Sequence, residues 1–130
     1  MPMERQILSR LNLWKESNHR KPLILKGARQ VGKTWALKEF GRRSYENVAY
    51  FNFEEHSEYK QFFEKTKEVD RILQNLMMAD GYQINPGSTL VIFDEIQECP
   101  DALTALIYFC ENAPEYHVAC AGSLLGIALS

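Results

Sequence analysis

The chain has 130 residues, 45% hydrophobic and 25% charged, which is enough for one globular domain with a core. No apolar run reaches the length of a membrane-spanning helix, and the N-terminus does not resemble a secretion signal. The three cysteines have neither paired spacing nor an even number, so we expect reduced thiols in a cytoplasmic protein.

Charge is distributed unevenly, although the net charge is only −2. All 15 Lys and Arg lie in residues 1–71 together with 10 acidic residues, whereas residues 72–130 hold 7 acidic residues and no Lys or Arg. The positive excess is spread over several expected helices, where solvated helix faces explain it equally well. It is therefore too weak to predict a nucleic-acid partner.

Helix-like and strand-like segments alternate along the chain. Helical spacing of apolar residues predicts a first helix over 3–17 and one or two helices over 59–77, with a break near Thr66. Short apolar runs predict strands at 23–25, 48–53, 90–93 and 116–121. This alternation predicts an α/β fold with a mostly parallel sheet covered on both faces.

Two helices carry more detailed expectations. The helix from Lys33 to Phe40 is expected to end at Gly41 in a left-handed C-cap. A later helix begins at Pro100-Asp101, and its apolar side is expected to hold four residues: Leu103, Leu106, Ile107 and Cys110. Cys120 lies in the last apolar strand and is expected to be a small core residue.

The most informative motif is a complete G-x-x-x-x-G-K-T loop: Gly27-Ala28-Arg29-Gln30-Val31-Gly32-Lys33-Thr34. It lies between a strand and a helix, where its N–H groups and the helix N-terminus form a phosphate site. We expect Lys33 to bind the β/γ-phosphates and the Thr34 hydroxyl to ligate Mg²⁺. Trp35 offers its backbone N–H, with its indole under the loop or near the nucleotide.

Asp94 and Glu95 follow the third strand directly. A carboxylate at the carboxyl end of a parallel strand lies at the same sheet edge as the phosphate loop. We expect Asp94 to hold Mg²⁺ opposite Thr34 and Glu95 to polarise the water that attacks the γ-phosphate. Taken alone, acidic residues after a strand are also typical of helix or turn caps.

Other polar residues near the expected strand ends leave alternatives open. Ser123 follows the fourth strand and either bonds the γ-phosphate or its water, or caps the turn at Gly122. Glu54 and Glu55 end the second strand, where a solvated strand end is the commoner role. Arg29 is expected to face solvent or a carboxylate.

These motifs together resemble the prokaryotic AAA-superfamily ATPases that carry a nuclease-like C-terminal domain. The matching residues are 21–34, 52–55, 89–100 and 121–129. The resemblance implies ATP rather than GTP, Mg²⁺, and Ser123 in the sensor position. It implies a three-layer P-loop NTPase fold of the additional-strand, RecA/AAA-like type, with the strand order 5-1-4-3-2.

The resemblance also gives an expectation about the extent of the domain. In the family the chain continues into a fifth strand, a helical lid and the C-terminal domain, so residues 1–130 are expected to be a partial ATPase core. Residues 1–20 would form a helix and loop leading into it. The strand at 23–25 would then have an unpaired edge, which favours self-association.

Two functions are open at this stage. One is an ATPase that uses Lys33, Glu95 and Ser123 in catalysis, and the other is a binding module that holds nucleotide without turning it over. Related ATPases complete their site with an arginine, which residues 72–130 lack, so we expect slow hydrolysis at best. A small-molecule kinase is less favoured, because basic acceptor-site residues are missing from the second half.

Overall fold

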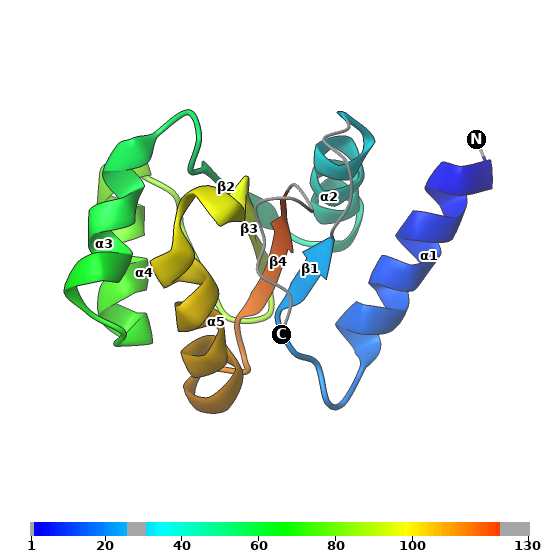
Figure 1. The fold of residues 1–130 in the computed structure, drawn as a ribbon. Coiled ribbons are helices and arrows are strands. Elements are labelled where there is room, and N and C mark those ends of the chain that lie inside the picture. The colour runs from blue at the N-terminus through cyan, green and yellow to red at the C-terminus, as the bar shows by residue number, and fades with distance from the viewer. Residues whose placement is uncertain (1, 26–30, 123–130) are drawn as a thin grey trace.

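A four-stranded parallel sheet forms the centre of the computed structural model, which describes residues 2–25 and 31–122. The strands are β1 (Leu23–Leu25), β2 (Asn47–Asn52), β3 (Thr89–Asp94) and β4 (His117–Ala121). Their order is β1-β4-β3-β2, and all pairings are parallel. Helices cover both faces, which confirms the predicted three-layer α/β fold (Figure 1).

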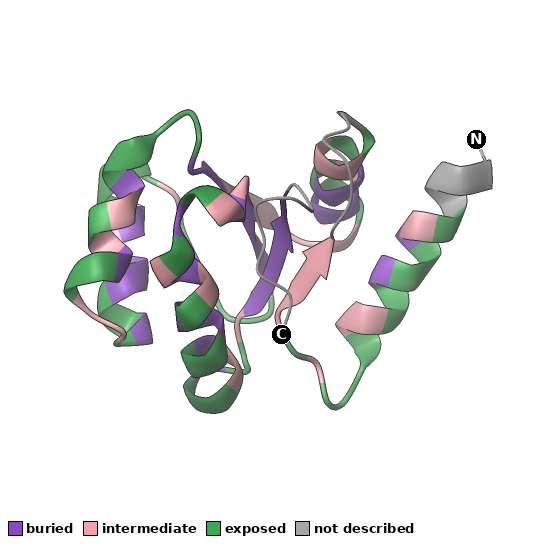
Figure 2. Ribbon diagram, in the orientation of Figure 1, coloured by how far each residue is buried: buried purple, intermediate pink, exposed green. Residues whose placement is uncertain are grey.

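Strand β3 lies between β4 and β2, and all six of its residues are buried. The run Leu90 to Phe93 is apolar on both faces, as expected for a central parallel strand. β4 separates β1 from β3, as the family resemblance implied. Figure 2 shows the resulting buried centre, with β3 and β4 purple and β1 only half-buried.

The first face of the sheet is covered by α1 (Pro2–Glu16) and α2 (Val31–Ser44). Alternate residues Leu90 and Ile92 of β3 point to this face, because side chains alternate along a strand. They pack in one buried cluster with residues of both helices, namely Leu8, Leu11, Leu37 and Phe40.

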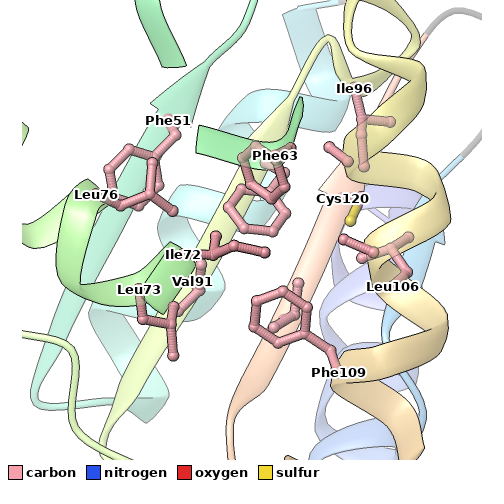
Figure 3. Packing of buried hydrophobic residues seen from close by; sticks show 14 of the residues in the cluster. Phe51, Phe63, Ile72, Leu73, Leu76, Val91, Ile96, Leu106, Phe109 and Cys120 are labelled. Carbon is pink, nitrogen blue, oxygen red and sulfur yellow. The ribbon is translucent and has the colours of Figure 1, made fainter. Parts of the chain in front are cut away.

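The opposite face is covered by α3 (Lys60–Lys65), α4 (Val69–Asp80) and α5 (Pro100–Asn112). Phenylalanine rings dominate this core, and Phe93 packs against both Phe63 and Phe109. Figure 3 shows Phe63 and Phe109 among the buried side chains between the helices and the sheet. The break between α3 and α4 falls at residues 66–68, as predicted near Thr66. α4 ends at Gly81, which has φ 75°.

The expected C-cap at Gly41 is wrong. Helix α2 continues through this residue to Ser44, and Gly41 is buried against the sheet. A Cβ atom at this position would lie 2.3 Å from Cγ2 of Val48 and 3.2 Å from Cδ2 of Leu90. Gly41 therefore lets α2 approach β2 and β3 closely, and it has no role in ending the helix.

The expected apolar side of α5 is also partly wrong. Ile107 is 56% exposed, whereas the residues of α5 that are buried are Ala102, Ala105, Leu106 and Phe109. The two alanines share a stripe with Phe109, and their small size lets this side of the helix lie close to the core. Cys120 is fully buried, as predicted, and all three cysteines are free thiols.

Candidate functional site

Polar groups meet where the N-terminal turn of α2 faces the carboxyl ends of the strands. The register places Asn52 of β2 opposite Asp94 of β3, and Asp94 opposite Ala121 of β4. Lys33 and Thr34 lie in the first turn of α2, and both are half-buried. The parallel sheet therefore brings the ends of three strands and one helix to a single edge, as predicted.

Asp94 is the centre of this site and is almost fully buried, with 4% of its surface exposed. Its Oδ2 accepts hydrogen bonds from Thr34 Oγ1 at 2.8 Å and from the Tyr50 hydroxyl at 2.5 Å. Its Oδ1 accepts the backbone N–H of Glu95 at 2.9 Å. Three donors thus fix the orientation of one carboxylate, which is how a buried charge is stabilised.

Tyr50 was not among the residues that sequence reasoning selected. Its ring lies under the ammonium group of Lys38, which is 4.0 Å from the ring centroid. Burial, followed by the hydrogen bond to Asp94, raises the pKa of Tyr50 well above its usual value, so the phenol stays neutral. One feature of the sequence could have pointed to Tyr50. It lies two residues before Asn52, hence on the same face of β2, and β2 pairs with the strand that carries Asp94.

Lys33 donates a hydrogen bond from Nζ to the backbone oxygen of Gly122 at 2.7 Å. This contact connects the start of α2 with the residue that follows β4. The predicted phosphate-loop residues Gly27, Ala28, Arg29 and Gln30 lie outside the described residues, as does Ser123. The backbone of Val31 is described as the first residue of α2.

Glu95 has a left-handed backbone, with φ 51° and ψ 46°, and it is the one described residue other than glycine with a positive φ. Its side chain is half-buried and accepts a hydrogen bond from Gln97 Nε2 at 2.8 Å. Backbone strain of this kind concentrates at functional sites. Gln97 was not selected from the sequence, since its contact depends on the turn that follows Glu95.

The remaining predicted residues lie at the margin of this group. Trp35 is 41% exposed. Glu54 and Glu55 are exposed in the turn after β2, where their backbone N–H groups both bond Asn52 Oδ1. Asn52 Nδ2 in turn donates to Glu55 Oε1 at 3.1 Å.

The donor set of Thr34 and Asp94 fits a hard divalent cation, because both side chains offer oxygen atoms. In residues 2–25 and 31–122 no three His, Cys, Asp or Glu side chains gather as a complete metal site. Mg²⁺ is usually held by one or two carboxylates, with phosphates and waters as further ligands. The pair therefore fits an ion that arrives with a phosphate ligand.

A parallel sheet in this order, with a helix N-terminus and a strand-end carboxylate at one edge, defines the P-loop NTPase fold class. The chain belongs to the AAA domain family, whose sequence profile matches residues 19–130. None of the described helices combines the length and the apolar character that a membrane span requires.

Comparison with solved structures supports the same fold. The structure of C. elegans PCH-2 is similar to this chain with a TM-score of 0.55 and 16% sequence identity. The similarity covers 99% of this chain and 38% of the PCH-2 chain. At this identity it shows the fold alone. No protein of curated function matches the sequence.

Proposed function

We propose that the chain binds ATP with Mg²⁺ at this edge and hydrolyses it slowly. The observation that carries the proposal is the 2.8 Å hydrogen bond between Thr34 of the G-K-T sequence and the buried Asp94. It joins two motifs that lie sixty residues apart and that nucleotide hydrolases use as a pair. Membership of the AAA domain family favours the same reading.

Four residues of the site that the structure describes have a proposed role in this reaction. Lys33 binds phosphate oxygens, and Thr34 with Asp94 holds Mg²⁺, which supplies charge neutralisation when bound. Glu95 orients and polarises the attacking water as a general base. The proposed roles of residues 27–32 in cradling phosphate and of Ser123 as sensor rest on the sequence.

A non-hydrolysing binding module is the second candidate, and the distribution of cations favours it. Residues 72–130 contain no Lys or Arg. An arginine that stabilises the transition state contributes about 10³- to 10⁵-fold to the rate. We expect this group to come from another molecule, so turnover by the isolated chain should be slow.

The binding test is a titration of Trp35 fluorescence with Mg·ATP and with Mg·GTP. Lys33→Ala should weaken ATP binding by about 10- to 100-fold, because it removes a charge-assisted phosphate contact. Arg42→Ala is the matched control, since this exposed cation on the same helix pairs with Glu39 and should leave binding unchanged. The absence of ATP binding to wild type, by fluorescence and by calorimetry, would contradict the proposal.

Hydrolysis is tested separately by phosphate release. Glu95→Gln should abolish the slow turnover and leave ATP binding intact, because the amide cannot accept a proton from water. Brisk turnover by monomeric wild type, abolished by Glu95→Gln, would contradict the slow rate. Intact binding with no turnover in either protein would select the binding module.

We also propose that the chain self-associates through the edge of β1. Within the described part of the chain β1 pairs only with β4, through Leu23, Ile24 and Leu25. These three residues are half-buried and apolar. An edge strand with free backbone groups and apolar side chains is a site for pairing with another strand.

A further inference from the structure

We propose that Tyr50 is a positioning residue for the metal-binding carboxylate, and that its phenol orients Asp94 for Mg²⁺. This inference rests on the proposed function. It assigns a role to a side chain on β2, a strand that contributes none of the residues proposed above to bind metal or nucleotide or to activate water.

The first step is the hydrogen bonding of the two carboxylate oxygens. An ionised carboxylate has about four acceptor positions, two on each oxygen. On Asp94, Oδ2 uses both for the hydroxyls of Thr34 and Tyr50, whereas Oδ1 uses one for the N–H of Glu95. One position on Oδ1 is left, so Oδ1 is the oxygen available to Mg²⁺ or to a water bound to it.

The second step concerns the direction of the phenol hydrogen. Asn52 Oδ1 accepts the backbone N–H groups of Glu54 and Glu55, at 2.9 and 3.0 Å, so the Nδ2 end of the amide faces the other way. Nδ2 lies 3.2 Å from the Tyr50 hydroxyl and donates to it. Because the phenol has one hydrogen, that hydrogen is directed to Asp94 Oδ2 at 2.5 Å.

The third step concerns the rigidity of the support. Tyr50 and Asn52 lie on the same face of β2, two residues apart, and the register places Asn52 opposite Asp94. Tyr50 is half-buried, with the Lys38 ammonium over its ring. A donor fixed on a strand in this way restrains carboxylate rotation, which Thr34 on α2 cannot do alone once its hydroxyl oxygen also ligates the ion.

The test compares ATP binding by calorimetry with excess Mg²⁺ and with EDTA. Tyr50→Phe keeps the ring and removes only the hydroxyl. It should weaken Mg²⁺-dependent binding about tenfold, the lower end of the 10- to 100-fold range for losing a partner of a metal ligand. Binding in EDTA should be unchanged, because no proposed contact of Tyr50 reaches the nucleotide.

The matched control is Tyr45→Phe. Tyr45 also has a raised pKa through burial, and its hydroxyl bonds His117 at the amino end of β4, away from the site. This variant should bind ATP as wild type does in both conditions. Asn52→Ala is a second variant, because it removes the donor that directs the phenol and should weaken the Mg²⁺-dependent part alone.

Five outcomes decide between the hypotheses. A tenfold loss of ATP affinity in Tyr50→Phe that occurs only with Mg²⁺ supports the inference. If Tyr50→Phe does not fold, the same loss in Asn52→Ala supports it. Equal losses with and without Mg²⁺ show a structural role and overturn it, as does wild-type behaviour of a folded Tyr50→Phe. Wild type that binds ATP without any effect of Mg²⁺ overturns it too. Wild type that binds no ATP contradicts the proposed function itself, and this inference with it.

Discussion

His117 is a buried histidine at the start of β4, with 7% of its surface exposed. It shares a 2.6 Å hydrogen bond with the hydroxyl of Tyr45 and packs edge-on against Trp14. Burial, together with smaller contributions from the nearby cations Arg20 and Lys15, lowers the pKa of His117 to about 4. The ring is therefore neutral in the folded protein at neutral pH.

This histidine predicts a pH dependence of stability. Its pKa is about 4 when folded and about 6.5 when unfolded, so between these values the unfolded chain binds more protons. The free energy of unfolding should therefore fall as the pH drops from 6.5 to 4, by roughly 2 kcal/mol from this residue. Urea unfolding at a series of pH values measures the fall.

The control for this prediction is His117→Phe, which keeps an aromatic ring and removes the titration. The difference between the two pH profiles isolates His117 from carboxylates such as Glu39, whose hydrogen bonds to Arg42 and Arg43 hold its pKa near 2. Parallel profiles for the two proteins over the window would show that His117 does not cause the fall.

At the scale of single residues, the sequence was informative where a motif spans contiguous positions. The proximity of Thr34 and Asp94 was expected, because both motifs lie at the same sheet edge, but their direct hydrogen bond was not. Tyr50 was missed, because in an apolar strand its spacing is that of a core residue. Its hydroxyl gains a meaning only when β2 pairs with β3 and Asn52 stands opposite Asp94.

Among the helices, α2 shows most directly how packing against the sheet requires a particular residue. Gly41 lies inside the helix, and an alanine there would place Cβ 2.3 Å from Val48 Cγ2. Val is stiff at χ1, so the strand or the helix must move. Gly41→Ala should lower the free energy of unfolding by about 1–3 kcal/mol, despite the higher helix propensity of alanine.

The measurement is urea unfolding of Gly41→Ala, of Val48→Ala and of the double variant. Truncating Val48 removes the clashing methyl groups, so the double variant should be less destabilised than the sum of the single variants. Strict additivity of the two changes would show that the close approach of α2 to β2 is not what Gly41 provides.

Hydrophobic spacing predicted which helices and strands the chain forms. It did not predict where α2 ends or which face of α5 is buried. The four strands and the break near Thr66 were predicted, because apolar runs and breakers mark them locally. The end of α2 was missed, since a glycine can serve a close contact as well as a C-cap. The face of α5 was missed because Ala102 and Ala105 are too small to stand out.

On the scale of the whole molecule, α1 and the loop after it are joined to the rest at several points, although all of α1 precedes residue 19, where the family match begins. Trp14 Nε1 donates to the backbone oxygen of Lys21 at 2.6 Å, and Lys15 Nζ donates to that of Ser44 at 2.7 Å. Arg20 reaches the backbone oxygen of Pro114 at 2.8 Å. The first helix is thus part of the folded core.

The edge of β1 leads to a prediction about assembly. If strands of two molecules pair there, sedimentation should show a concentration-dependent rise in mass. The backbone N–H groups of residues 23–25 should then exchange hydrogen more slowly at high concentration, since new hydrogen bonds protect them. β3 is covered on both sides and serves as the internal control. A monomer at every concentration would contradict self-association.

The backbone of Glu95 has a consequence for the stability of the chain. A residue with φ 51° and ψ 46° lies where glycine or asparagine would be more stable than glutamate, by a margin of about 1 kcal/mol. Folding alone would thus favour a different amino acid here. The chain keeps a carboxylate at a cost in stability, next to Asp94 and in contact with Gln97. Such a cost is expected where the side chain has a role of its own, as in the general-base role that we propose for Glu95.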